Sequence, residues 1–335
     1  MANKNIILKI TDDCNLNCSY CYANNESKKN KMEVDKIIKI FKKIIDFEDS
    51  EIDVFLYGGE PSKNIDFLNN IQKIIDSFPS VNFTFGLNTN LIDLNDDFLN
   101  FIIKKNIQLR VSIDGISYEH NRNRFKNHLE FDYFNCNLRK LCLEKNFFIV
   151  DVSINVYNFS DLYEIFIFYY NLKKKVKFYF TGENLGLNMI DTIIFEFSRI
   201  YDFLFLNNLE PYDFFSIKKN LLPCMYNDPY SFFISSDYYL TSCFATFNEK
   251  KIINLLDSDL GEIVLSYSEE ESLDEKAFVG NFGEKCIDCF AFSVCCPCGL
   301  QNKKNNGFFY KVNETTCFFY KRFYKLLKQK EEKFG

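Results

Sequence analysis

Three cysteines near the amino terminus constrain this chain more than any other feature of its sequence. Cys14, Cys18 and Cys21 are spaced C-x3-C-x2-C within the stretch CNLNCSYCY. Three thiols at this spacing fit three corners of a [4Fe–4S] cube and leave the fourth iron without a protein ligand, where a small chelating molecule can bind. The spacing therefore predicts a catalytic centre, with a zinc knuckle or three buried cysteines as the alternatives.

The flanks of this loop predict its place in the fold. Residues 5–11 (NIILKIT) have the pattern of a strand, and the residues after the loop have that of an amphipathic helix. The apolar face of this helix comprises Val34, Ile37, Ile38, Phe41, Ile44 and Ile45. A second motif, YGGEP at residues 57–61, follows a predicted strand at 51–57. Its glycines allow a close backbone approach to a ligand, and its carboxylate suits an ammonium group.

Together these motifs resemble the radical S-adenosylmethionine (SAM) superfamily, whose signature loop has the same cysteine spacing with an aromatic residue before the third cysteine. The resemblance implies that the three cysteines hold a [4Fe–4S] cluster that binds SAM. It also implies that the GGE segment contacts the amino group of SAM. The cofactor-binding residues that it implies in these two motifs are Tyr20, Tyr22, Gly58, Gly59 and Glu60.

Strand-like and helix-like segments alternate six times through the first two thirds of the chain, which predicts a parallel sheet wrapped by helices. The predicted strands lie near residues 5–11, 51–57, 81–88, 107–113, 147–156 and 176–181. A doubly wound sheet and an open barrel both fit this order. Several strands alternate apolar with polar side chains, which favours a sheet that curves around a ligand-filled lumen. The resemblance implies the same α/β fold, a partial (β/α)6 TIM-like barrel.

Polar side chains stand at the carboxyl ends of the predicted strands, where the active sites of such barrels lie. They include Asn88 in the third strand, Ser112 and Asp114 at the end of the fourth, and Asn155 near the end of the fifth. The resemblance implies that these residues bind SAM, with Ser112 and Asn155 at its carboxylate or ribose. Each is also a common turn former or helix cap. The HNRNR run at residues 120–124 matches many members of the superfamily.

The last third of the chain holds a second group of cysteines. They are Cys224, Cys243, Cys286, Cys289, Cys295, Cys296, Cys298 and Cys317. Their density implies a metal, either zinc or further iron–sulfur clusters. The region resembles the SPASM extension of radical SAM enzymes. That resemblance implies one auxiliary [4Fe–4S] cluster on Cys286, Cys289, Cys295 and Cys317, and another on Cys224, Cys243 and Cys298.

This region departs from the family pattern at three points. Tyr238 stands where the pattern has a glycine, the gap between Cys295 and Cys298 is one residue short, and Cys296 is additional. Cys296 can replace either neighbour, so the ligand set and the number of auxiliary clusters, one or two, stay open. We expect two domains: the barrel at 1–215, and a small cysteine-rich iron–sulfur domain with a closing helix at 216–335.

Composition limits the partners. The net charge is -6 and no extended basic run precedes the last helix, so we expect no nucleic-acid partner. No apolar run spans a bilayer and no secretory signal opens the sequence, so we expect a cytoplasmic protein without a membrane partner. Thirteen cysteines in a reducing compartment indicate metal binding rather than disulfides. With two histidines in all, a serine or cysteine protease triad is disfavoured.

The resemblance also implies a reaction, the reductive cleavage of SAM to a 5′-deoxyadenosyl radical that takes hydrogen from a peptide or protein. We expect a maturase that forms a thioether or carbon–carbon cross-link, or epimerises a residue, in a ribosomally made peptide. One alternative is an anaerobic sulfatase maturase that forms formylglycine, although Phe244 follows Cys243 where that family has an acid. Another is a non-catalytic electron-transfer scaffold. Expected partners are a flavodoxin- or ferredoxin-like electron donor and a separate leader-recognition protein.

Overall fold

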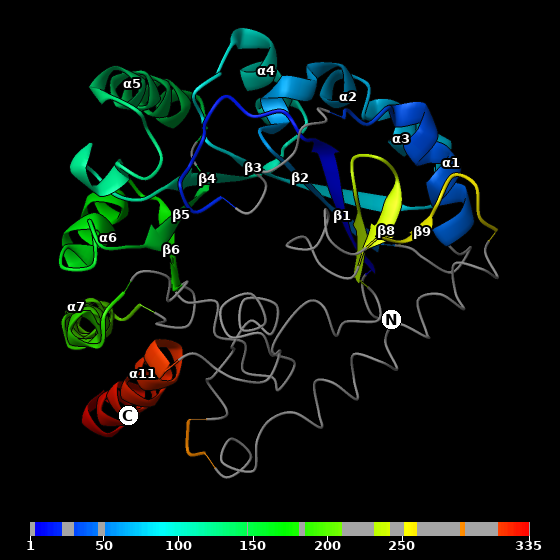
Figure 1. The fold of residues 1–335 in the computed structure, drawn as a ribbon. Coiled ribbons are helices and arrows are strands. Elements are labelled where there is room, and N and C mark those ends of the chain that lie inside the picture. The colour runs from blue at the N-terminus through cyan, green and yellow to red at the C-terminus, as the bar shows by residue number, and fades with distance from the viewer. Residues whose placement is uncertain are drawn as a thin grey trace. The chain divides into compact units, whose positions relative to one another are not determined.

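The expected alternation of strands and helices is present in the structure (Figure 1), a computed structural model that describes residues 4–21, 30–45, 51–145, 147–180, 185–209, 231–241, 251–259, 289–291 and 314–334. The strands are β1 (Lys4–Thr11), β2 (Glu51–Gly58), β3 (Asn82–Thr89), β4 (Gln108–Ile113), β5 (Ile149–Ile154), β6 (Lys175–Phe180), β7 (Ser231–Ile234), β8 (Tyr239–Thr241) and β9 (Lys251–Asn254). The helices are α1 (Val34–Ile44), α2 (Ile65–Asn69), α3 (Gln72–Ser77), α4 (Asp96–Lys104), α5 (His128–Glu144), α6 (Leu162–Asn171), α7 (Leu187–Leu206) and α11 (Glu314–Phe334), and short 3-10 helices are η1 (Pro61–Asn64) and η2 (Glu119–Asn121). Strands β1 to β6 therefore coincide with the six predicted strands.

The chain divides into two compact units, and each is described by itself. The first comprises Met1–Ser112, Asn123–Phe148 and Asp228–Ser272, and the second comprises Ile113–Arg122, Ile149–Asn227 and Leu273–Gly335. The domain boundary expected between residues 215 and 216 lies outside the described residues.

The sheet of the first unit has the strand order β4-β3-β2-β1-β7-β8-β9. Strands β1 to β4 are parallel to their neighbours, and β7 pairs in parallel with the other edge of β1. The prediction of a parallel sheet is thus confirmed. Two antiparallel pairs, β7 with β8 and β8 with β9, extend it, and neither was predicted from the sequence.

The two faces of this sheet differ in what they bury. On one face Ile6, Leu8 and Ile10 are fully buried, and helices α1 to α4 lie along the strands (Figure 1). The polar face expected from strands β3 and β4 does not continue across β1, β2 and β7. There Ile7 and Phe233 form a buried cluster. Phe55 and Tyr57 pack against this cluster, so part of the opposite face is apolar.

Polar caps set where helices of the first unit begin. Asn95 Oδ1 accepts the Phe98 N–H at 2.8 Å at the start of α4, and Asn127 caps α5 in the same way.

The apolar pattern at 67–78 predicts one helix, but the structure divides it into α2 and α3. At the break, the Ile71 N–H donates to the Leu68 carbonyl at 3.3 Å, a three-residue turn in place of the four-residue turn of an α-helix.

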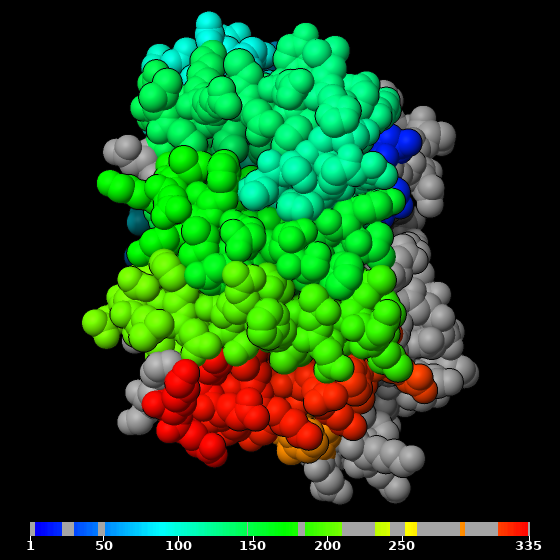
Figure 2. All heavy atoms as spheres, turned by 90° about the vertical axis from the view of Figure 1, so that its left-hand side faces the viewer, coloured from blue at the N-terminus to red at the C-terminus, as the bar shows by residue number. Residues whose placement is uncertain are grey.

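In the second unit, β5 and β6 pair in parallel, and α11 lies along α7 (Figure 2). The rings of Phe319 and Phe323 on α11 lie 6.2 and 5.8 Å from that of Phe197 on α7. Lys330 Nζ is 2.7 Å from Asp202 Oδ2, which joins the same two helices further along. The apolar face of α11 is therefore buried against α7. No helix in the described parts of the chain is both long enough and apolar enough to span a bilayer.

Candidate active site around the first cysteine loop

The three cysteines of the first motif follow β1 directly. Cys14, Cys18 and Cys21 are all half-buried and none forms a disulfide. The Cys21 N–H donates to the Cys18 carbonyl at 3.0 Å, and the Leu16 N–H donates to Cys14 Sγ at 3.4 Å. Burial raises the pKa of the Cys14 thiol to about 11, although the bond from Leu16 opposes the shift. Without a metal this thiol is therefore protonated at neutral pH.

Two side-chain amides lie beside Cys14. Asn90 Nδ2 donates to Asn15 Oδ1 at 2.7 Å and lies 3.9 Å from Cys14 Sγ. Asn15 Nδ2 is buried and has no hydrogen-bond partner among the described residues. Thiolate and sulfide sulfurs accept such hydrogen bonds, so this donor set fits an iron–sulfur cluster held by the loop.

The described residues contain no three His, Cys, Asp or Glu side chains that converge as a single metal ion requires. A [4Fe–4S] cube places each ligating thiolate on a different iron, so its ligands are spread more widely than those of one ion.

The glycines of the GGE turn pack against the backbone that leads into the cysteine loop. Gly58 has φ +153°, and a Cβ there would lie 2.4 Å from the Thr11 carbonyl oxygen. A Cβ on Gly59 would lie 2.4 Å from the Asp13 carbonyl oxygen. The Gly59 N–H donates to Thr11 O at 2.9 Å and the Glu60 N–H to Asp13 O at 2.8 Å. These glycines are thus required by the packing of the chain itself, and their predicted contact with SAM stays a prediction.

Glu60 joins the ends of β2 and β3. Its side chain is 1% exposed, and its carboxylate accepts Thr89 Oγ1–H and the Asn90 N–H, each at 2.8 Å. It also caps η1 by accepting the Ser62 N–H at 3.2 Å. Burial raises the pKa of this carboxyl, and the three donors oppose the shift. A carboxylate held in this way is a fixed acceptor near the cysteine loop, and its contact with SAM stays a prediction.

A segment before α5 holds the other side of the cysteine loop. The Ser19 N–H donates to the Asn123 carbonyl at 2.9 Å, and Ser19 Oγ donates to Asn123 Oδ1 at the same distance. Arg124 Nη2 donates to Tyr20 Oη at 2.7 Å, with the guanidinium 5.8 Å from the centre of the Tyr20 ring. The predicted aromatic residue of the motif is therefore fixed from outside the loop.

Two further predicted residues of the first unit meet at the carboxyl ends of their strands. Ser112 Oγ on β4 donates to Asn88 Oδ1 on β3 at 2.8 Å. Both side chains are half-buried. They are available for polar contacts with a ligand, and their contact with SAM stays a prediction.

In the second unit, Asp114 and Asn155 lie in one buried network. Asn155 Nδ2 donates to Asp114 Oδ2 at 3.4 Å. The Asp114 N–H donates to Asn121 Oδ1 at 2.8 Å, and Asn158 Nδ2 donates to the Asp114 carbonyl at 2.6 Å. Asp114 is fully buried. The network fixes the backbone of the SIDG segment, which gives Asp114 a structural role in addition to the predicted one.

His120 packs against the glycine of the same segment. Gly115 has φ +159°, and a Cβ there would lie 2.4 Å from His120 Nδ1. Nδ1 accepts the Ile116 N–H at 3.3 Å, which assigns the ring proton to Nε2. Nε2 lies 3.3 Å from Asp161 Oδ2 and donates to it. The imidazole is therefore oriented from both sides.

Most of the remaining predicted ligands lie outside the described residues. These are Tyr22, Cys224, Cys243, Cys286, Cys295, Cys296 and Cys298. Cys289 and Cys317 are described, and both are half-buried and free of disulfides. The auxiliary clusters therefore stay predictions.

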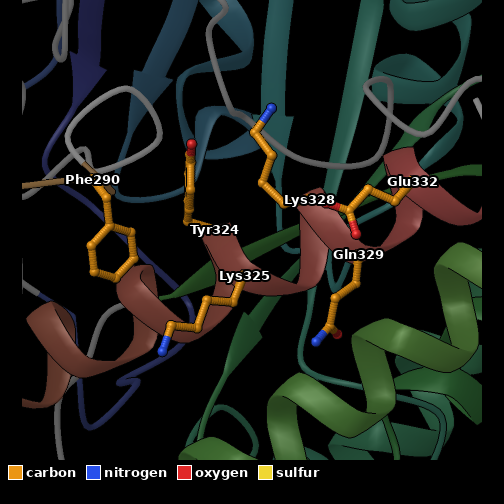
Figure 3. A pocket seen from close by; sticks show the side chains of 6 residues that line it. All are labelled: Phe290, Tyr324, Lys325, Lys328, Gln329 and Glu332. Atoms are coloured by element: carbon orange, nitrogen blue, oxygen red, sulfur yellow. The ribbon is translucent and has the colours of Figure 1, made fainter.

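A pocket of about 300 Å³ lies on α11 (Figure 3). Its lining residues are Phe290, Tyr324, Lys325, Lys328, Gln329 and Glu332. The ring of Phe290 lies 5.5 Å from that of Tyr324. None of the predicted cofactor or metal residues that the structure describes lines this pocket.

Sequence reasoning missed several residues of the site. Asn15 lies inside the cysteine motif itself, and Asn90 follows the third predicted strand, so both were within reach of the sequence. Asn123 lies in the HNRNR run, but nothing in that run predicts its contact with Ser19.

Comparison with known proteins supports the resemblance read from the motifs. Residues 8–136 match the family model described as "Radical SAM superfamily". The chain is 35% identical over 131 residues to "Uncharacterized protein MJ0907" of Methanocaldococcus jannaschii, covering 37% of this chain and 43% of that protein. It is 25% identical over 128 residues to the "Cysteine-type anaerobic sulfatase-maturating enzyme" of Clostridium novyi, covering 36% of this chain and 34% of that protein. These matches span less than half the length of the curated relatives.

Solved structures are similar over nearly the whole chain. "Native anSMEcpe with bound AdoMet" gives a TM-score of 0.74 at 16% identity, covering 98% of this chain and 99% of that one. Streptococcus suis SuiB bound to precursor peptide SuiA gives 0.67 at 14% identity, covering 94% and 76%. AdoMet is S-adenosylmethionine. At these identities the likeness shows the fold, and it confirms the predicted α/β barrel with its parallel sheet.

Proposed function

We propose, from the premise that residues 8–136 form a radical SAM domain, that this chain is a radical SAM peptide maturase. The observation that carries the proposal is the joint packing of the two sequence motifs. The Gly59 and Glu60 N–H groups bond the backbone on either side of Asp12, directly before Cys14. The three-cysteine loop and the GGE turn are thus held as one unit, as a site for a cluster and a ligand chelated to it requires.

The domain match implies a [4Fe–4S] cluster and SAM as cofactors. When bound, they supply the one-electron cleavage of SAM to methionine and a 5′-deoxyadenosyl radical that takes a hydrogen atom from the substrate. Cys14, Cys18 and Cys21 would hold the cluster, and the amides of Asn15 and Asn90 would donate to its sulfurs. Tyr20, Glu60, Asn88 and Ser112 would orient SAM.

A peptide substrate is supported by the peptide-bound similar structures. One is "Native anSMEcpe with bound AdoMet and Cp18Cys peptide", with a TM-score of 0.76, and another is SuiB with its precursor peptide. An oxidative cross-link removes two hydrogens from the peptide. The deoxyadenosyl group would take one as an atom and the other would leave as a proton, and an auxiliary cluster held by the C-terminal cysteines would supply the acceptor for the remaining electron. A flavodoxin- or ferredoxin-like donor would supply the electron that starts each turnover, and a separate protein would bind a leader peptide.

The proposal is tested with anaerobically reconstituted protein, SAM, reductant and candidate peptides encoded beside the gene, in ordinary and deuterated water. We expect 5′-deoxyadenosine and a peptide lighter by ~2 mass units in both solvents, the signature of oxidative cross-linking. A gain of ~1 unit in deuterated water alone would instead identify epimerisation. The variant with Cys14, Cys18 and Cys21 all replaced by alanine is the control. No 5′-deoxyadenosine from the wild type under strong reductant would overturn the proposal in favour of an electron-transfer scaffold.

A formylglycine-forming maturase is the second candidate, supported by the similarity to the Clostridium novyi enzyme. An acid that could serve as its base is Asp237, in the turn between β7 and β8. Ser235 Oγ donates to Asp237 Oδ1 at 2.6 Å, so this carboxylate has a fixed orientation. An aldehyde in a cysteine-containing test peptide, detected with a hydrazine probe and lost in the Asp237→Asn variant, would select this reaction over cross-linking.

A further inference from the structure

A buried ion pair lies directly before the cysteine loop. Lys9 Nζ, from β1, is 2.8 Å from Asp12 Oδ1, and the two side chains are 2% and 1% exposed. Charges buried this deeply are tolerated when they are paired and hydrogen-bonded. The pair therefore fixes the Asp12 side chain relative to strand β1.

The third member of this network comes from a distant part of the sequence. Ser236, in the turn between β7 and β8, is buried, and its Oγ lies 2.8 and 2.7 Å from the two carboxylate oxygens of Asp12. The hydroxyl therefore donates to this carboxylate. Internal bonds hold the turn in shape: the Tyr238 N–H donates to the Ser235 carbonyl at 2.8 Å, and the Tyr239 N–H donates to Ser235 Oγ at 3.0 Å.

The same turn is anchored to the start of α1. Tyr238 Oη accepts the Glu33 N–H at 2.8 Å. Lys36 Nζ lies 5.2 Å from the centre of the Tyr238 ring. The hydroxyl of Ser236 is thus presented to Asp12 by a turn that is itself fixed on a helix.

Backbone bonds hold Asp12 on two further sides. The Asp12 N–H donates to the Asn30 carbonyl at 3.0 Å, and the Asn30 N–H donates back to Asp12 Oδ2 at 3.2 Å. The GGE turn bonds the carbonyls of Thr11 and Asp13. Cys14 follows Asp13 directly. Its backbone therefore continues from a segment that hydrogen bonds and an ion pair hold in place.

We propose that Asp12 is a positioning residue which, held by Lys9 and Ser236, fixes the segment that presents Cys14 and couples the β7–β8 turn to the cysteine loop. Groups that hold a metal ligand in place in this way determine how well it is oriented. The consequence for the cluster rests on the proposed function, whereas the coupling itself is a property of the chain and can be measured without iron.

The first test uses the metal-free protein and the Ser236→Ala variant. Alkylation of Cys14 by iodoacetamide, followed by peptide mass spectrometry, reports how often the loop opens. We expect alkylation about tenfold faster than in the wild type, because a hydrogen bond to a charged group is lost. The Ser236→Thr variant keeps the hydroxyl and should restore the wild-type rate.

A matched control lies in the same hairpin. Thr241 is buried, and its Oγ1 donates to the Phe233 carbonyl at 3.3 Å instead of to Asp12. The Thr241→Val variant should alkylate Cys14 at the wild-type rate. Equal rates for the Ser236→Ala and Thr241→Val variants would overturn the inference.

A double variant tests the ion pair without leaving a charge buried alone. Lys9→Met combined with Asp12→Leu replaces both partners by apolar groups of similar size, which buried pairs commonly tolerate. We expect this protein to fold and to alkylate Cys14 as fast as the Ser236→Ala variant. A folded double variant with the wild-type rate would contradict a positioning role for Asp12.

The loaded enzyme gives a separate readout. In reconstituted Ser236→Ala protein we expect the EPR signal of the reduced cluster with SAM to be broader than in the wild type, because Cys14 is held less uniformly. If the wild type takes up no cluster at Cys14, Cys18 and Cys21, the proposed function fails, and the alkylation rates still decide the inference. If the alkylation rates do not differ, the inference fails whatever the cluster does.

Discussion

Asn15 and Asn90 place amide groups beside Cys14, and this is the feature of single residues with the clearest chemical consequence. Asn90 Nδ2 can donate to Asn15 Oδ1 and to Cys14 Sγ because an amide nitrogen carries two hydrogens. Hydrogen bonds to a ligand sulfur stabilise the reduced, more negative form of an iron–sulfur cluster. We therefore expect these amides to raise the reduction potential of a cluster held by Cys14.

Replacing Asn90 by leucine removes this donor at similar volume. We expect the midpoint potential of the cluster to fall by about 40 mV, the one-electron equivalent of a hydrogen bond worth about 1 kcal/mol. An EPR-monitored redox titration measures it. The Asn70→Leu variant, which changes an exposed amide bonded to Asp66, is the control and should leave the potential unchanged. An unchanged potential for both variants would show that the Asn90 amide does not act on the sulfur.

Gly59 is the second residue with a specific prediction. A Cβ there would lie 2.4 Å from the Asp13 carbonyl oxygen, and backbone cannot move aside as a side chain can. We expect the Gly59→Ala variant to be destabilised by about 2 kcal/mol, which urea unfolding measures. Gly186→Ala is the matched control, because its Cβ would meet only the flexible end of Asn188. Equal losses in the two variants would contradict this account.

Among the elements, the β7–β8 hairpin holds a residue other than glycine in a backbone conformation that favours glycine. Tyr238, which stands where the pattern has a glycine, has φ +68°, in the left-handed region that favours glycine. The cost of this conformation is offset by the burial of the ring and by the bond from the Glu33 N–H to its hydroxyl. Side-chain anchoring therefore holds Tyr238 in a conformation that glycine would adopt without strain.

The Tyr238→Phe variant removes the acceptor at the start of α1. We expect a loss of about 1 kcal/mol in the free energy of unfolding at neutral pH. Burial raises the pKa of the Tyr238 phenol above its usual value of 10.0. The folded state therefore holds this proton more tightly than the unfolded state does, and the stability that it contributes is present below pH 10 and lost as pH rises further.

Urea unfolding of both proteins between neutral pH and the alkaline range tests this sign. The wild type should lose more stability above pH 10 than the Tyr238→Phe variant, so that the two curves converge. Parallel curves would mean that the phenol is not buried as described.

Periodicity predicted the long elements well and the short ones poorly. Strands of eight residues such as β1 and β2 are long enough to be read from sequence, β1 as a nearly continuous apolar run and β2 as an alternation. Strands of three or four residues, such as β8 and β7, do not, which is why the hairpin was missed. The break between α2 and α3 was missed because it is a local change to a three-residue turn at Ile71, which leaves the apolar pattern unbroken.

For the molecule as a whole, iron content gives the number of iron–sulfur clusters per chain. If the C-terminal cysteines hold auxiliary clusters, replacing Cys14, Cys18 and Cys21 by alanine should remove about four irons per chain and leave the rest. Iron analysis and visible absorbance of the reconstituted variant measure this. Loss of all iron would limit the protein to one cluster and would assign the C-terminal thiols another role.

The sequence by itself determined the cysteine motif, the GGE motif and the succession of six strands along the chain, because motif spacing and apolar periodicity are local properties. Only the tertiary structure decided which side chains complete the site. Asn90 meets Asn15 across 75 residues, and Arg124 meets Tyr20 across 104. Ser236 meets Asp12 across 224 residues. Such polar contacts depend on how strand ends and turns converge in space, and they leave no periodic signal in the chain.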